Sequence, residues 1–331
     1  MRQFESARRL KHLLMTRVAV IGAGAIGGFV AAALAKAGVA VVVVARGEHA
    51  AAIKRNGLHV QSDLGAFTAT VEVTEDLRTV DAPFDFLLLA FKAHQWPGVL
   101  SMLAPRAGCA TPLVTMQNGL PFWFVREPAL ESVDPHGAIG HLFPDTQVIG
   151  GVVHVSGRIL APGRVHQTGG LRYIFGDPGG GCGARCSELV QLFARAGLAA
   201  EADSNIRETV WLKLVNNVGL NAVSVLRRMT IKPMLEDTDS RSAVRRLMIE
   251  GLRVGQAMGV VSEVDVDARI AYAARLDDVK TSMLQDFERQ RALELDPILG
   301  AVCELGVRYG VETPEVRRAY AALQRMNLTP K

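Results

Sequence analysis

The stretch Arg17–Arg46, RVAVIGAGAIGGFVAAALAKAGVAVVVVAR, decides the fold of this chain. It begins with a short β-branched run at Arg17–Ile21 and continues into a glycine-rich turn. The next segment predicts a helix over Phe29–Ala37, which ends at the following glycine. The unbroken apolar run Val39–Ala45 is typical of a parallel strand buried on both faces. Strand, helix and strand in such close succession predict a βαβ unit.

The turn inside this unit has the G-x-G-x-x-G spacing, made by Gly22, Ala23, Gly24, Ala25, Ile26 and Gly27. Glycine spacing alone is weak evidence, but here it follows a strand and opens a helix. Gly22 would make the tight turn, Gly24 would let a pyrophosphate approach the backbone, and Gly27 would let the helix pack on the sheet. The free N–H groups at the helix start favour phosphate. The sequence therefore predicts a dinucleotide site.

The end of the second strand indicates which dinucleotide binds. A site specific for NAD places an acidic residue about 20 residues after the loop, where it binds the ribose hydroxyls. This strand ends instead at Arg46, whose planar guanidinium suits the 2′-phosphate of NADP. Lys54 in the next predicted helix is a weaker second candidate. We therefore expect NADP (NADPH) as the cofactor.

The rest of the chain predicts an α/β fold: an N-terminal Rossmann-type doubly wound sheet followed by an all-helical domain. Further strands are expected at Leu58–Gln61, Thr68–Val73, Phe84–Ala90 and Leu113–Met116, and helices at His49–Asn56, Trp96–Leu103 and Ser187–Ala196. Short segments at Val152–Ile159, Arg164–Thr168 and Leu171–Phe175 predict an antiparallel meander at the sheet edge. Long helical patterns then follow at Ile206–Arg228, Ser240–Met258, Glu263–Tyr272, Ser282–Arg291 and Pro297–Tyr309. We expect a basic, disordered extension at 1–16, an NADP-binding domain at 17–203 and a helical substrate and catalytic domain at 204–331.

Composition limits the other function classes. The chain has 331 residues and a formal charge of +4, of which the first sixteen residues carry +3 from four basic side chains and one acidic one. The near-neutral remainder offers no footprint for nucleic acid. No apolar run approaches the roughly 18 residues that cross a bilayer. The four cysteines have neither zinc-site nor disulfide-framework spacing, so we expect reduced thiols, no metal site and a cytoplasmic protein.

Polar residues in apolar surroundings indicate where chemistry takes place. Lys92 and Asn118 each follow the carboxyl end of an apolar strand, where ligands of open α/β sheets bind. Lys213, Asn217 and Asn221 are spaced i, i+4, i+8 and form one stripe of a largely apolar helix. This stripe is either a functional site or a hydrogen-bonded structural network, and the residues alone leave both interpretations open.

Several separated motifs together resemble the ketopantoate reductase (2-dehydropantoate 2-reductase) family. They are the glycine loop with Arg46, Phe91–Gln95 (FKAHQ), Gln117–Gly119 (QNG), Trp211–Asn217 (WLKLVNN) with Asn221, and Ser282–Asp286 (SMLQD) with Glu294. The resemblance covers about Arg17 to Met326. It implies the NADPH-dependent reduction of 2-dehydropantoate to (R)-pantoate, a step of pantothenate and coenzyme A biosynthesis.

The resemblance also implies residue roles. Lys213 would be the proton donor to the substrate carbonyl, and Glu294 would hold the substrate hydroxyl and orient Lys213. The substrate's polar groups would be bound by Asn217, Asn221 and Ser282. The cofactor would be contacted by Lys92, Asn118 and, through its backbone, Ser156. From the residues alone, Glu294 would reach the same site as Ser282 only if their helix continued to it.

An aromatic stretch departs from the family pattern. Leu120–Val125 (LPFWFV) follows Asn118–Gly119 and begins an insertion that would reshape the substrate pocket, form a lid or make a subunit contact. A paralogue that reduces another 2-oxo acid, of the β-hydroxyacid or opine dehydrogenase type, therefore stays open, as does a non-catalytic NADP-sensing protein. The expected partner is a small 2-oxo acid, with a homodimer contact offered by the helical domain.

Overall fold

The computed structural model describes residues 16–81, 83–275 and 278–327, so the predicted basic extension lies, apart from Thr16, outside the described residues. The chain forms two compact units. The first comprises residues up to 117 together with residues 139–206, and the second comprises residues 118–138 together with the chain from 207 onward. Segment 118–138 therefore groups with the C-terminal helices, which a division at residue 203 does not anticipate. Among the described helices, none combines the length and the apolar character needed to cross a membrane.

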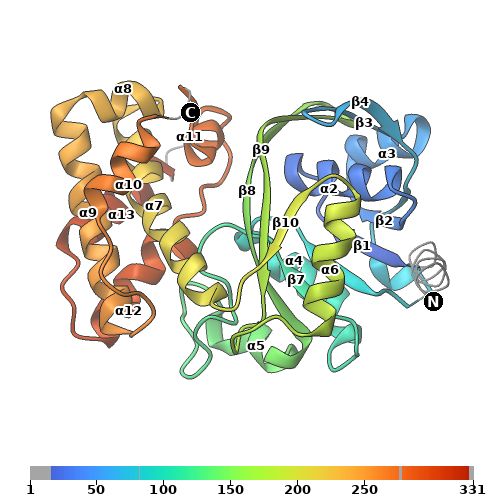
Figure 1. The fold of residues 1–331 in the computed structure, drawn as a ribbon, viewed down its shortest axis with the longest axis horizontal. Helices are drawn as coiled ribbons and strands as arrows, with labels where there is room; N and C mark the ends of the chain where they lie inside the picture. The colour runs from blue at the N-terminus through green and yellow to red at the C-terminus, as the bar shows by residue number, and fades with distance from the viewer. Residues whose placement is uncertain (1–15, 82, 276–277, 328–331) are drawn as a thin grey trace, which may run out of the picture. The chain divides into compact units, whose positions relative to one another are not determined.

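The strands of the first unit form one mixed sheet (Figure 1). Its strands are β1 Arg17–Ile21, β2 Ala40–Val44, β3 Leu58–Ser62, β4 Gly65–Ala69, β5 Glu72–Thr74, β6 Phe86–Leu89, β7 Leu113–Thr115, β8 Val148–Ala161, β9 Arg164–Gly176 and β10 Ala199–Ala202. The order is β4-β3-β9-β8-β7-β6-β1-β2-β5, with β10 beside β9. The strands β5, β2, β1, β6, β7 and β8 pair in parallel, which confirms the predicted Rossmann-type fold.

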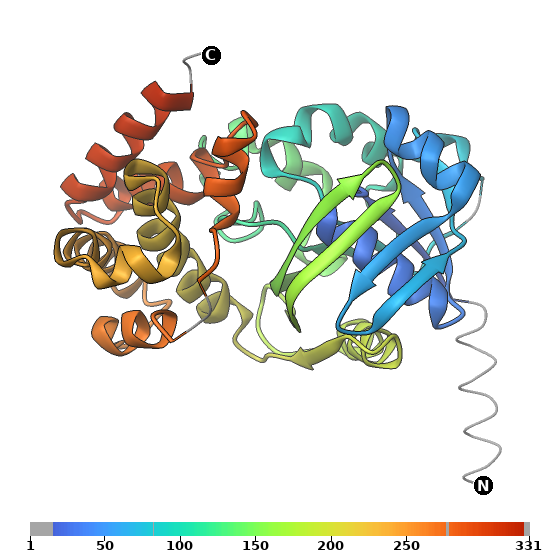
Figure 2. The same cartoon turned by 90° about the horizontal axis from the view of Figure 1, so that it is seen from above.

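The predicted edge meander is wrong. Its three short strands are two long ones, β8 and β9, which pair antiparallel as a hairpin in the middle of the sheet, between β7 and β3. Figure 2 shows this hairpin beside the β3–β4 hairpin. The glycines that suggested a strand break are absorbed by register shifts around Ser156 and by the left-handed backbone of Gly170 (φ 71°). The strand predicted at Thr68–Val73 is likewise divided between β4 and β5.

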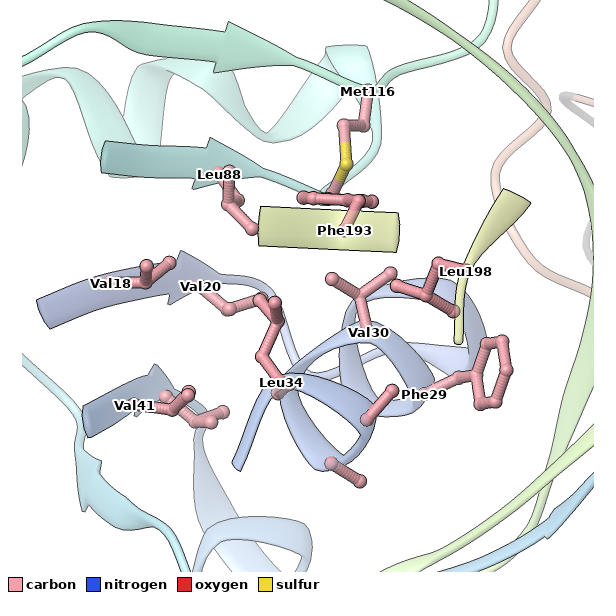
Figure 3. Packing of buried hydrophobic residues seen from close by; sticks show 14 of the residues in the cluster. Val18, Val20, Phe29, Val30, Leu34, Val41, Leu88, Met116, Phe193 and Leu198 are labelled. Atoms are coloured by element: carbon pink, nitrogen blue, oxygen red, sulfur yellow. The ribbon is translucent and has the colours of Figure 1, made fainter. Parts of the chain in front are cut away.

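The helices of the first unit are α2 Ala25–Lys36, α3 Gly47–Asn56, α4 Trp96–Leu103, α5 Ala138–Leu142 and α6 Ala184–Arg195. Helices α2 and α6 pack on the same face of the sheet, where Leu34 and Phe193 meet Val20 and Leu88 in the hydrophobic core (Figure 3). The alternate strand residues Ala19, Ile21, Leu87 and Leu89 are also fully buried, so the central strands are covered on both faces.

The second unit is helical, with α7 Ile206–Arg227, α8 Ile231–Glu236, α9 Thr238–Ala257, α10 Val266–Ala273, α11 Ser282–Glu288, the π-helical turn η6 Asp296–Gly300, α12 Ala301–Arg308 and α13 Pro314–Asn327. Helix α7 packs against α9, because Gly255 leaves room for the indole of Trp211, whose Nε1–H donates to the Gly251 carbonyl at 3.1 Å. The helix predicted to run to Arg291 ends at Glu288, and the one predicted from Pro297 begins with the wider turn η6.

The aromatic stretch after Asn118 belongs to the core. Phe122, Trp123 and Phe124 are each at most 2% exposed, and the Phe124 ring stacks on Trp211 of α7 with centroids 5.8 Å apart. The end of the same segment is held by Glu304 of α12, which accepts hydrogen bonds from the backbone N–H groups of residues 131 and 132. Because these rings are buried, the stretch is neither an open lid nor an exposed subunit contact.

Candidate active site

The glycine loop connects β1 to α2 with the geometry that its spacing predicts. Gly22 has φ 103°, and a side chain there would come within 2.9 Å of the Ala90 carbonyl oxygen. A Cβ on Gly27 would lie 2.0 Å from the carbonyl oxygen of Gly22. In contrast, a Cβ on Gly24 would meet nothing within 4 Å, so open space lies over the loop at this position.

Helix α2 begins at Ala25, four residues earlier than predicted, so its first turn lies within the loop. Its N-cap residue, Gly24, supplies no side-chain hydrogen bond to the first N–H groups. These N–H groups and the positive end of the helix dipole therefore point to the open space above Gly24. That arrangement fits the pyrophosphate of a dinucleotide.

Arg46 lies next to this loop. The N–H of Gly22 donates to the carbonyl of Val44, the last residue of β2, at 3.2 Å, and Arg46 follows two residues later as the N-cap of α3. Its side chain is exposed and forms no ion pair with any residue in the described ranges. An exposed guanidinium without an acidic partner, at the end of β2, fits the 2′-phosphate of NADP.

The neighbouring strand ends converge on the same region of the first unit. The loop residue Gly22 lies against the backbone of Ala90 and Phe91, so Lys92 follows directly after this contact. Gln117 then ties the end of β7 to the end of β6, because its side-chain Nε2 donates to the Phe91 carbonyl at 3.1 Å. The fold therefore brings the segment that carries Lys92 to the glycine loop.

The β8–β9 hairpin also reaches the loop. A Cβ on Gly157 would lie 3.4 Å from the Cβ of Ala25, so the neighbouring residue Ser156 is close to the start of α2. The Ser156 hydroxyl donates to the Gly169 carbonyl at 3.2 Å and lies 3.1 Å from the Thr168 hydroxyl. The side chain is thus engaged in hydrogen bonds within the hairpin.

A lysine, an amide and a carboxylate come together in the second unit. The Nζ of Lys213, on α7, donates to the side-chain oxygen of Asn118 at 3.0 Å. The Lys213 side chain is mostly buried, and burial lowers its pKa from 10.5 to about 8, while the negative charge of Glu294 acts in the opposite direction. The structure therefore places the Asn118 side chain in contact with the Lys213 ammonium group and the Glu294 carboxylate close enough to influence its charge.

The other polar residues of the stripe continue along α7. Asn221 is only 5% exposed and Asn217 is half-buried. Within the described ranges, neither side chain makes a hydrogen bond to another residue. A structural network would pair these amides, so their lack of protein partners argues for ligand-binding groups.

Ser282 begins α11, whose N-cap is Thr281. The Thr281 hydroxyl accepts from the N–H of Leu284 at 3.2 Å and lies 2.6 Å from the hydroxyl of Ser224, which is on α7 three residues after Asn221. This buried pair holds the start of α11, and with it the exposed Ser282, against α7. Sequence reasoning did not single out Thr281, although threonine directly before a helical pattern is an N-cap signal.

Glu294 reaches Lys213 by a route that helical periodicity does not predict. Its helix ends at Glu288, the chain reverses through Gln290 in the left-handed conformation (φ 54°), and Glu294 follows in a non-helical segment, 8% exposed. The condition that the helix of Ser282 continue to Glu294 is therefore not met. Because the chain doubles back here, the carboxylate approaches α7 from a separate segment.

A contact between Gly119 and Pro297, which the sequence did not predict, holds this arrangement in place. Gly119 has φ 82°, and a Cβ there would lie 2.8 Å from both the Cβ and the carbonyl oxygen of Pro297. The N–H of Leu120 donates to the same Pro297 carbonyl at 2.7 Å. The turn that follows Asn118 is thereby held against η6, which begins just after Glu294. π-Helical turns are frequent at functional sites.

Together, a glycine loop that fits a dinucleotide and a buried lysine with a lowered pKa define a nucleotide-dependent oxidoreductase. In the part of the chain that the structure describes, no cluster of His, Cys, Asp or Glu is arranged to hold a metal ion, and the four cysteines are free.

Comparison with known proteins gives the family. The family model "Ketopantoate reductase PanE/ApbA" matches residues 18–180, and the model of its C-terminal domain matches residues 205–327. The 2-dehydropantoate 2-reductase of Mesorhizobium japonicum is 36% identical over 318 residues, which cover 94% of this chain and 97% of the relative. The chain belongs to the ketopantoate reductase family, whose members are NADP-dependent oxidoreductases acting on CH–OH groups.

Solved structures agree on the fold. A crystal structure assigned to this family, from Ralstonia solanacearum MolK2, superposes with a TM-score of 0.88 at 35% identity, covering 94% of this chain and 97% of that one. D-mandelate dehydrogenase, solved with NADH and anilino(oxo)acetate, has a TM-score of 0.82 at 22% identity, covering 94% and 98% of the two chains. At that identity, the second likeness concerns the fold alone.

Proposed function

We propose that this protein uses NADPH to reduce 2-dehydropantoate to (R)-pantoate, a step of pantothenate and coenzyme A biosynthesis. The observation that carries the proposal is the mostly buried Lys213, with a pKa near 8, bonded to Asn118 and influenced by Glu294. Relatives named 2-dehydropantoate 2-reductase that match over nine-tenths of the chain support the choice of substrate.

The first unit would hold the cofactor through the loop Gly22–Gly27, with Arg46 on the 2′-phosphate and Lys92 and the Ser156 backbone as further contacts. Bound NADPH supplies the hydride that reduces the C2 carbonyl carbon of a 2-oxo acid. The carbonyl oxygen gains negative charge in that step and needs both a proton and electrostatic stabilisation. These two requirements fall to the chain's own residues.

Lys213 meets both requirements. Its ammonium stabilises the developing alkoxide, and its Nζ–H supplies the proton. A pKa near 8 leaves most of the lysine charged at neutral pH and makes proton release easier than from a lysine with the ordinary value. Asn118 directs the Nζ, and Glu294 limits the loss of charge that burial causes.

The amides Asn217 and Asn221 and the Ser282 hydroxyl would bind the carboxylate and the other polar groups of the acid. Glu294 would accept a hydrogen bond from the substrate hydroxyl. The amides are suited to this task because they lie in one stripe with Lys213 and have no partners among the described residues.

A steady-state assay of 2-dehydropantoate against other 2-oxo acids, aromatic ones included, with NADPH and NADH in parallel, tests the proposal. We expect the highest kcat/KM for 2-dehydropantoate with NADPH. A clear preference for another 2-oxo acid would identify a paralogue instead. NADPH binding without turnover of any 2-oxo acid would identify an NADP-sensing protein.

Lys213→Ala tests the assigned role directly. This variant should lose turnover by a factor of about 10² to 10⁴, the usual contribution of a positioned proton donor, while its Kd for NADPH stays the same. Lys232→Ala, at an exposed position of α8, is the matched control. Full turnover by Lys213→Ala would remove the lysine from the mechanism.

Location and assembly are part of the same proposal. Four free cysteines favour the reducing cytoplasm. A dimeric ketopantoate reductase from Staphylococcus aureus shares the fold with a TM-score of 0.75 at 23% identity. We propose a homodimer here as well, and sedimentation equilibrium at micromolar concentration tests it.

A further inference from the structure

His49 has no role in the mechanism described above, yet it lies in the first turn of α3, three residues after Arg46. Its Nδ1 accepts a hydrogen bond from the backbone N–H of Gly163 at 3.1 Å. Gly163 belongs to the turn between β8 and β9. The imidazole therefore joins α3 to the hairpin that carries Ser156.

The ring of His49 also lies near the glycine loop. Because Nδ1 accepts a hydrogen bond, the neutral imidazole carries its proton on Nε2. This Nε2 is buried and has no regular hydrogen-bond partner. Burial lowers the pKa of His49, and an interaction with the backbone of Ala23 opposes that effect. The backbone of Ala23, within the glycine loop, therefore lies near the ring, although Nε2 donates no hydrogen bond to it.

Close packing and a backbone hydrogen bond hold the turn around Gly163 in place. A Cβ on Gly163 would lie 3.2 Å from the Cβ of Ala52 on α3, and the Gly163 carbonyl accepts from the N–H of His59 on β3 at 2.9 Å. The β8 strand of the same hairpin passes the loop at Gly157 and Ala25. One imidazole therefore lies between three parts of the dinucleotide site: the glycine loop, the helix that follows Arg46, and the hairpin.

We propose that His49 is a positioning residue of the cofactor site, which holds the start of α3, and with it Arg46, at a fixed place relative to the phosphate loop. The proposal rests on the assignment of Arg46 to the 2′-phosphate. A dinucleotide engages the loop with its pyrophosphate and Arg46 with its 2′-phosphate at the same time. The spacing between these two protein elements therefore sets how well NADP binds compared with NAD.

Three substitutions separate the two contacts of the ring. His49→Ala removes both. His49→Asn keeps an oxygen near the position of Nδ1, which can accept from Gly163, but does not reach Ala23. His49→Gln places an amide near the position of Nε2, beside the Ala23 backbone, but loses the acceptor for Gly163. His141→Ala, an exposed histidine of α5, serves as the control.

The readout is the Kd for NADPH and for NADH, measured by titrating the fluorescence of the reduced nicotinamide without any 2-oxo acid. We expect His49→Ala to weaken NADPH binding about tenfold and NADH binding less than about threefold, because NADH has no 2′-phosphate for Arg46 to bind. The Asn and Gln variants should lie between Ala and wild type. A general loss of structure would weaken both nucleotides alike.

Repeating the titration in an Arg46→Ala background completes the test. There the additional effect of His49→Ala on NADPH should fall below about twofold, because the group that His49 positions is gone. Three results would each overturn the proposal. His49→Ala could weaken the binding of NADPH and NADH equally, or leave the Kd of both unchanged. It could also weaken NADPH binding as much in the Arg46→Ala background as in the wild type. If His49→Ala does not fold, wild-type selectivity in both the Asn and the Gln variants would overturn it. Since no 2-oxo acid is present, a wrong substrate assignment does not affect the result.

Discussion

The substitution Glu294→Gln tests the electrostatics of the proposed proton donor. The carboxylate is 8% exposed and raises the pKa of Lys213 against the larger lowering caused by burial. Glutamine has nearly the same shape but no charge. We therefore expect the pKa of Lys213 to fall below about 8 in this variant, since an opposite charge nearby shifts a pKa by about 1 to 3 units.

The magnitude follows from the protonated fraction of the lysine, because reduction needs the charged form. With a pKa of about 8, roughly three-quarters of Lys213 is charged at pH 7.5. A fall of about one unit leaves roughly one quarter charged, which is about a threefold lower rate. At pH 6 both proteins are almost fully protonated, whereas at pH 9 the wild type exceeds the variant by about ninefold from this effect alone.

The assay is single-turnover reduction of 2-dehydropantoate, followed by NADPH absorbance in a stopped-flow instrument from pH 6 to pH 10. Single turnovers avoid a limit set by product release. If Glu294→Gln only removes a substrate contact, the rate falls by the same factor at every pH. If it lowers the pKa of Lys213, the ratio of the wild-type rate to the variant rate increases with pH. Glu263→Gln, at an exposed position of the same unit, should follow the wild-type profile. If the rate of Glu294→Gln declines at the same pH as the wild-type rate, or at a higher pH, then the Glu294 charge does not raise the pKa of Lys213.

Three further outcomes follow from the structure. Asn118→Asp places a carboxylate 3.0 Å from the Lys213 ammonium and should move the alkaline fall of the rate to higher pH, measured in the same assay. Lys213→Met should raise the free energy of unfolding by up to about 3 kcal/mol at pH 7, because the folded pKa lies below the unfolded one. This gain is complete below about pH 8 and disappears as the pH rises toward 10.5, which urea unfolding at several pH values can follow. Gly27→Ala should abolish NADPH binding in a fluorescence titration, because its Cβ would lie 2.0 Å from the Gly22 carbonyl oxygen; normal binding would mean that the loop rearranges freely.

The sequence predicted those elements whose structure depends on residues close together along the chain. Periodicity predicted β1 and the helix that carries Lys213, Asn217 and Asn221, because apolar spacing alone decides which face is buried. It failed at the β8–β9 hairpin, where the glycines indicated strand breaks but register shifts in the middle of the sheet absorbed them. It also failed at the end of α11, because the reversal at Gln290 has no glycine or proline to announce it.

The sequence by itself determined the cofactor class, since the glycine loop, the helix start and Arg46 lie within one βαβ unit and chain connectivity places them together. Only the tertiary structure decided the surroundings of Lys213. Asn118 and Glu294 are far from it along the chain, and their approach depends on the fit of Gly119 against Pro297 and on the reversal after α11. The same holds for His49, whose contacts to Gly163 and the Ala23 backbone join residues that sequence spacing does not relate. A lysine's pKa is set by burial and by charges in space, and neither can be obtained from the order of residues.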